Sequence, residues 1–153
     1  MQLKPDILEK LGAYCSYRER CIQEVEEKLE RLNVAPSNKE AYINHLLELD
    51  VINEERFCNS FVRGKFRIKG WGRIKIRAAL RRNKLSEDLI SRSLEEVIPD
   101  KDYLALMDEL ISKKASRIKE KNKYKRNASL MRYLHQRGFE TDLIYDRINS
   151  LEE

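Results

Sequence analysis

The chain has 153 residues, of which 41% are apolar and 37% charged, with a net charge of +5. This apolar fraction can form a folded core, and five Gly and three Pro are few for the turns of a β-rich fold. No apolar run reaches the roughly eighteen residues of a membrane-spanning helix, and the N-terminus lacks a signal-peptide core, so we expect a cytoplasmic protein without membrane contacts.

Helical periodicity begins near the N-terminus. Residues 5–17 place their apolar side chains on one face, and residues 25–32 repeat apolar residues at i, i+4 and i+7. Pro36 and Ser37 break the chain and then start a third helical pattern, whose apolar residues lie at residues 41–49. We interpret residues 1–52 as a first three-helix repeat.

The next helical pattern opens at Asn53, which is a good N-cap and precedes two glutamates in the first turn. Residues 73–77 (RIKIR) alternate like a strand, but good helix formers follow directly. We therefore favour a helix over about residues 73–83, preceded by a loop that contains Gly70 and Gly72. Ser86 is expected to cap the next helix, and residues 53–98 form the second repeat.

Asp100 or Asp102 is expected to open a long helix, and two further apolar patterns follow it. Residues 99–153 form the third repeat. It matches the second repeat at an offset of 54 residues in the pairs Leu80/Leu134, Leu85/Phe139, Asp88/Asp142, Leu89/Leu143, Ile90/Ile144 and Leu94/Ile148.

The first repeat fits the same pattern if about four extra residues lie around residues 35–39. In each repeat one apolar residue after the second helix is expected to fill the small core, and we call it the plug residue. The three plug residues are Val34, Leu85 and Phe139. The sequence thus predicts an all-α fold of three tandem three-helix repeats in an elongated, curved array. Adjacent repeats are expected to stabilise each other by burying their apolar faces.

Positive charge is concentrated in the middle of the chain. Residues 56–126 carry twenty-one basic and nine acidic side chains, whereas residues 1–55 carry seven and twelve. The segment 61–84 has no acidic residue and ten basic ones: Arg63, Lys65, Arg67, Lys69, Arg73, Lys75, Arg77, Arg81, Arg82 and Lys84. These ten are the candidate residues for binding a partner protein or nucleic acid.

Arg73, Arg77, Arg81 and Lys84 would form one stripe of the predicted helix, where stacked like charges oppose folding. The repeat explains the apolar residues of this segment, and we interpret its charge as serving a polyanionic partner. The alternative is a solvated face that lacks acidic residues.

Two further features leave alternatives open. Trp71 and Phe66 could stack on bases, although a tryptophan between two glycines is more often a packing residue. A second basic run at residues 112–126 is either an exposed helix end or a second binding segment. The sequence does not place it relative to residues 63–84.

No catalytic or metal-binding pattern is evident. His45 and His135 lie in helical patterns, and the three cysteines form no CxxC pair or Cys/His spacing. We expect buried thiols in a reducing compartment, no cofactor, and no enzymatic activity.

Three segments together resemble the bacterial RecX family: ERCIQEVEEKL, NEERFCNSFVRGKFRIKGWGRIKIRAAL and RGFETDLIYDRI. The resemblance extends from about Leu11 to Leu151. It implies three tandem three-helix repeats, and departs from the family at Cys21, where a serine N-cap is usual and a thiol would cap more weakly.

The resemblance also implies a function. RecX proteins are regulators that bind the RecA–DNA filament along its groove and mainly inhibit its recombinase, ATPase and coprotease activities in DNA repair, recombination and the SOS response. Weaker, phosphate-mediated contacts with single- or double-stranded DNA and a monomeric state are further expectations. A helical DNA-binding module without a recombinase-specific role is the alternative, because short three-helix units are similar to helix-turn-helix proteins.

Overall fold

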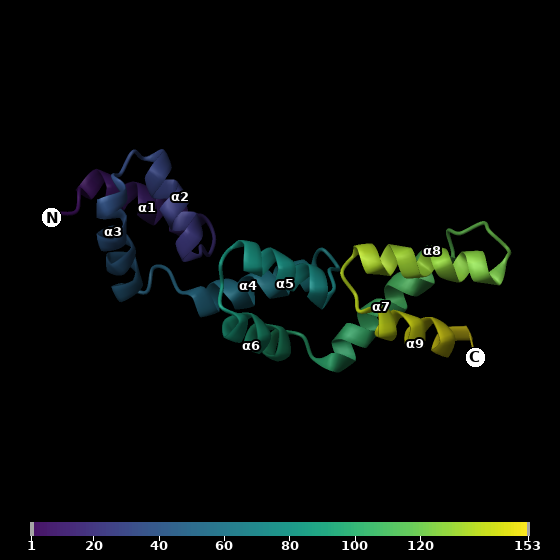
Figure 1. The fold of residues 1–153 in the computed structure, drawn as a ribbon. Coiled ribbons are helices and arrows are strands. Elements are labelled where there is room, and N and C mark those ends of the chain that lie inside the picture. The colour runs from purple at the N-terminus through teal and green to yellow at the C-terminus, as the bar shows by residue number, and fades with distance from the viewer. Residues whose placement is uncertain (1, 153) are drawn as a thin grey trace.

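The computed structural model describes residues 2–152, and this part of the chain contains helices and no strands. Three groups of three helices follow one another along an elongated array, with the two termini at opposite ends (Figure 1). The predicted all-α array of three-helix repeats is therefore confirmed. The helices are α1 (Pro5–Tyr17), α2 (Ile22–Arg31), α3 (Pro36–Glu48), α4 (Glu54–Arg67), α5 (Arg73–Arg82), α6 (Glu87–Val97), α7 (Asp100–Ala115), α8 (Lys123–Gln136) and α9 (Thr141–Glu152).

Local sequence signals set several helix starts. The Asn53 side chain accepts a hydrogen bond from the Arg56 N–H at 3.0 Å, and Ser86 accepts one from the Leu89 N–H at 3.2 Å. Both N-caps were predicted from the sequence. The ambiguous segment 73–77 is the first half of α5, as the helix formers after it indicated.

The repeat is visible in the backbone after each second helix. Asn33, Lys84 and Gly138 have left-handed φ values of 61°, 61° and 95°. In each repeat the residue that follows donates its N–H to the carbonyl five positions earlier, which is the pattern of a Schellman cap. Leu85 and Phe139 are buried as predicted plugs, whereas Val34 is half-buried.

The extra residues expected around residues 35–39 do not form a longer turn. The third helix of each repeat begins two residues after its plug, at Pro36, Glu87 and Thr141. Pro36 occupies the first turn of α3, where its missing N–H removes no helical hydrogen bond. It therefore starts the helix, in agreement with the reading that Pro36 and Ser37 end the preceding segment and begin the third helix.

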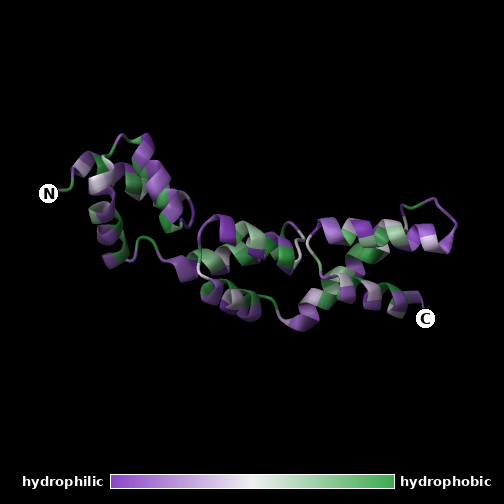
Figure 2. Cartoon of the chain, in the orientation of Figure 1, coloured by the Kyte–Doolittle hydropathy of each residue, from purple (hydrophilic) through white to green (hydrophobic). Residues whose placement is uncertain are grey.

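The apolar side chains form two cores. One lies within the first repeat and includes Leu11, Val25, Leu29 and Leu46. The other runs without interruption through the second and third repeats, and Cys21 is the first-repeat residue that joins it. Hydrophobic stretches, shown in green in Figure 2, occur on the helices of all three groups. The second and third repeats are thus coupled by apolar packing, and the first repeat has a core of its own.

Candidate interaction surface

The basic segment 61–84 comprises the end of α4, the loop 68–72 and α5. The structure divides its ten cations into two groups according to whether a carboxylate lies within ion-pairing distance.

Four arginines have such a partner. Arg73 bonds Glu140 at 3.0 Å and Asp100 at 2.8 Å. The other pairs are Arg67–Asp102 at 3.0 Å, Arg77–Glu87 at 3.0 Å and Arg81–Glu87 at 2.5 Å. The stripe of Arg73, Arg77 and Arg81 therefore faces acidic residues from other parts of the chain. These four arginines therefore have a role within the fold, and their contact with a partner stays a prediction.

Glu87 balances two of these cations. Hydrogen bonds from Arg81, and then from Arg77, hold the pKa of its carboxyl below the ordinary value. Because both arginines reach the same exposed carboxylate at the start of α6, they connect α5 to α6 within the second repeat.

The second group has no carboxylate within 4.0 Å among residues 2–152; its members are Arg63, Lys65, Lys69, Lys75, Arg82 and Lys84. Lys65 and Lys75 are half-buried, and the other four are exposed. We call this group the unpaired cations.

Trp71 has a packing role. Its ring is half-buried against the shared core, and the ammonium groups of Lys65 and Lys75 lie 4.7 and 4.4 Å from its centroid. Phe66 is 2% exposed and stacks on Tyr103, with 6.0 Å between centroids. These contacts favour the packing interpretation of Trp71, and Phe66 is a core residue.

The glycine after Trp71 permits a close approach between repeats. The Gly72 N–H donates to the Arg137 carbonyl at 2.7 Å, and the Ile74 N–H donates to the Gly138 carbonyl at 2.9 Å. A Cβ atom on Gly72 would lie 2.4 Å from the Gly138 carbonyl carbon. The loop glycine thus lets backbone from the second repeat bond directly to backbone of the third.

Tyr103 lies at the centre of this junction between the second and third repeats. It is fully buried, and its ring lies 5.2 Å from that of Phe139. Its hydroxyl accepts the Arg73 N–H at 2.9 Å and donates to Glu140, while the Arg73 guanidinium stacks 3.8 Å from the ring centroid. Burial, followed by the bond to Glu140, raises the pKa of the Tyr103 hydroxyl. The sequence reading missed this cluster because no local spacing brings these residues together.

The junction between the first and second repeats is mainly polar. Glu54 accepts the Ile22 N–H at 3.1 Å, and Arg56 pairs with Glu19 and, at 3.1 Å, with Asp50. Burial is the main cause that raises the pKa of the Glu54 carboxyl. The first repeat therefore docks mainly through polar contacts, whereas the third repeat combines ion pairs with an apolar core that it shares with the second.

This polarity predicts a pH dependence. A carboxyl whose pKa is raised by folding stabilises the protein below its ordinary pKa of 4.5 and loses that contribution as pH rises through the higher folded value. Relative to the native chain, Glu54→Gln is expected to gain stability as pH is raised from about 4 to 7. Thermal unfolding of both proteins across this range measures the difference, and a difference that stays constant would contradict the prediction.

The second basic run lies at the outer end of the third repeat. It covers the end of α7, the loop to α8 and the first turn of α8, away from α5 in Figure 1. Lys113 pairs with Glu109 at 2.8 Å, and Lys123 pairs with Glu152 at 3.3 Å. Arg126 donates to the carbonyls of Ile118 and Glu120. Local contacts thus account for part of its charge.

All three cysteines are unpaired and buried. Burial is the main cause that raises the pKa of Cys21 to about 12 and that of Cys58 to about 11, and it also raises the pKa of Cys15. We expect the native protein to react slowly with a disulfide reagent at pH 8, because the thiolate is the reactive form. Counting the protein thiols that react with the reagent over time, with and without urea, tests this expectation. A rapidly reacting thiol in the native protein would contradict it.

Within residues 2–152, no helix combines the length and apolar character required to cross a membrane. The same residues contain no group of three or more His, Cys, Asp or Glu placed to hold a metal ion.

Comparison with known proteins identifies the family. A family model described as "RecX, second three-helix domain" matches residues 53–94, and one described as "RecX, third three-helix domain" matches residues 100–147. Together they cover more than half of the chain. The chain belongs to the RecX family. The resemblance seen in the sequence is confirmed.

RecX proteins of several bacteria are similar over most of this chain. The "Regulatory protein RecX" of Clostridium perfringens (strain SM101) is 30% identical over 132 residues, which span 84% of this chain and 58% of that protein. That of Pelodictyon phaeoclathratiforme is 29% identical over 84% of this chain and 78% of its own. The RecX protein of Prosthecochloris aestuarii is 26% identical over 94% of this chain and 92% of its own length. This chain therefore spans little more than half of the Clostridium protein and most of the other two.

Crystal structures of RecX have the same fold. RecX from Lactobacillus salivarius matches with a TM-score of 0.84 and 25% identity, covering 97% of this chain and 99% of that one. A second structure, of "regulatory protein RecX", also gives a TM-score of 0.84, over 95% of this chain and 70% of that one. Its identity is 21%, so it supports the fold alone.

Proposed function

We propose that this RecX family member is a non-enzymatic, monomeric regulator that binds the RecA–DNA filament and mainly inhibits its recombinase, ATPase and coprotease activities. Such a regulator would act in the cytoplasm, in DNA repair, recombination and the SOS response. The observation that carries the proposal is the family membership, since relatives of similar length are named regulatory proteins.

The shape and charge of the molecule support this role. Three repeats in series form an elongated array that could contact more than one protomer of a filament (Figure 1). The unpaired cations lie on the central repeat, where acidic protein surface or DNA phosphates could neutralise them. An array bound across neighbouring protomers would hinder their exchange or the closure that ATP hydrolysis requires.

A helical module that binds naked DNA is the second candidate. The exposed, unpaired Arg63, Lys69, Arg82 and Lys84 favour it, because such cations bind phosphates without sequence preference and with strong salt dependence.

Hydrolysis of ATP by the cognate RecA on single-stranded DNA distinguishes the two candidates. The regulator is expected to inhibit hydrolysis at substoichiometric amounts. Absence of inhibition, together with tight and salt-sensitive binding to naked DNA, would instead identify the DNA-binding module.

A further inference from the structure

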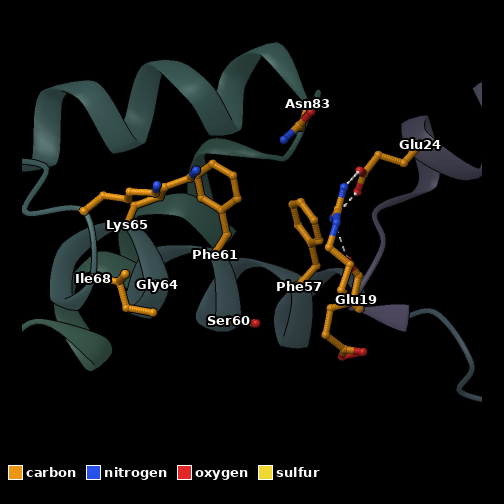
Figure 3. A pocket seen from close by; sticks show the side chains of 11 residues that line it. Glu19, Glu24, Phe57, Ser60, Phe61, Gly64, Lys65, Ile68 and Asn83 are labelled. Atoms are coloured by element: carbon orange, nitrogen blue, oxygen red, sulfur yellow. Dashed lines mark hydrogen bonds and ion pairs between the residues drawn. The ribbon is translucent and has the colours of Figure 1, made fainter. Parts of the chain in front are cut away.

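A groove of about 530 Å³ lies between the first and second repeats, where α4 faces the connection between α1 and α2 (Figure 3). Its α4 wall combines aromatic, aliphatic and basic side chains, and its opposite wall carries two glutamates and an arginine. The residues used below are Phe57, Phe61, Lys65, Ile68 and Lys69 on α4 and its end, and Arg18, Glu19 and Glu24 on the first repeat.

The acidic groups of the groove have internal partners. Glu24 pairs with Arg18 and accepts the Cys21 N–H at 3.2 Å. Glu19 pairs with Arg56, which lies in the first turn of α4. These pairs neutralise the first-repeat wall of the groove.

The cations of the α4 wall have no such partners. Lys65 and Lys69 belong to the unpaired cations, and the part of the chain that the structure describes places no carboxylate within 4.0 Å of either. An occupant of the groove therefore meets net positive charge from these two ammonium groups. Charge complementarity indicates an acidic occupant.

Ile68 distinguishes a protein occupant from nucleic acid. Its side chain is 82% exposed at the C-cap of α4, beside Lys69, and it takes no part in either core. An aliphatic side chain gains little from phosphates or base edges, but it gains free energy when another protein covers it. Beside Ile68, the same wall carries Phe61, whose ring centroid lies 5.8 Å from that of Phe57 and 5.3 Å from the Lys65 ammonium, so the wall is both apolar and basic.

We infer that this groove docks a segment of a partner protein that carries acidic side chains around at least one apolar side chain. The inference rests on the proposed function, according to which the partner is the RecA filament. Both repeats line the groove, and they have separate cores joined by polar contacts. The docked segment would therefore also fix the first repeat relative to the second.

The test compares Ile68→Asp with Ile74→Asp in the full chain. Ile74 is 52% exposed on α5 and does not line the groove, so the control makes the same change of charge outside it. Inhibition of RecA ATP hydrolysis on single-stranded DNA, binding to a labelled naked oligonucleotide and thermal unfolding are measured for both. Ile68→Asp is expected to raise the half-inhibitory concentration about tenfold over the control, with equal oligonucleotide binding. The unfolding measurement verifies that both variants are folded at the assay temperature, since a carboxylate is less favourable at the C-cap of α4 than in the first turn of α5.

Equal inhibition by the two variants would overturn the inference. So would a loss of oligonucleotide binding specific to Ile68→Asp, because that result would make the groove a nucleic-acid site. Lys69→Gln is expected to weaken inhibition about threefold through the lost charge. If the native chain does not inhibit hydrolysis at all, the proposed function itself fails, and this outcome is distinct from a failure of the groove variants.

Discussion

Gly138→Ala is expected to lower the free energy of unfolding by about 3 kcal/mol or more and to loosen the third repeat from the second. Gly138 has φ of 95°, which an alanine adopts only with strain. A Cβ atom there would lie 2.3 Å from the Lys75 Cβ and 2.6 Å from its backbone nitrogen. The backbone cannot withdraw freely, because the Gly138 carbonyl accepts the Ile74 N–H at 2.9 Å.

Urea or thermal unfolding followed by circular dichroism measures this effect. Gly12→Ala is the matched control, since Gly12 lies inside α1 and nothing would come within 4 Å of its Cβ. Removing a glycine from a helix interior should stabilise by up to about 1 kcal/mol. If Gly138→Ala unfolds at the same urea concentration as the native protein, the two repeats do not depend on this close approach.

Arg73→Glu is expected to destabilise the junction between the second and third repeats by about 2–4 kcal/mol. The native guanidinium is only 25% exposed, pairs with Glu140 and Asp100 and stacks on Tyr103. The substitution removes these contacts and places a third carboxylate beside the two acidic residues. Reversal of an exposed cation such as Arg82 should change stability by less than about 0.5 kcal/mol.

Thermal unfolding, followed by the near-ultraviolet circular dichroism of the aromatic residues, measures the stability of this junction. The charge swap Arg73→Glu with Glu140→Arg should recover part of the lost stability, because it restores one ion pair. Unchanged stability of Arg73→Glu alone would contradict the structural role. A weaker filament interaction of Arg73→Glu would not by itself identify a contact residue, whereas the same result for Arg82→Glu would.

The helices and their order could be predicted from the sequence, because their signals are local. Apolar spacing within a few turns marks each buried face, and a capping side chain such as Asn53 or Ser86 bonds an N–H three residues away. The match of the second and third repeats at 54 residues also follows from pattern alone. Pro36 is a local signal of the same kind, because proline is well tolerated in the first turn of a helix and breaks a helix in its interior.

The candidate site could be predicted only in part. Its ten cations are visible in the sequence, but the acidic partners of Arg73 lie 27 and 67 residues away along the chain. Local spacing carries no information about such pairs. Folding therefore divides one run of like charges into arginines that hold helices and repeats together and cations that have no internal partner.

The sequence by itself determined the helices, the threefold repeat and the family. The tertiary structure decided how the repeats are joined, because a junction depends on which surfaces meet. Apolar packing and backbone hydrogen bonds through Gly72 and Gly138 join the second and third repeats. Charged contacts of Glu54 and Arg56 join the first repeat to the second. The groove at that polar junction exists because residues of both repeats line it, and no single segment of the sequence encodes it.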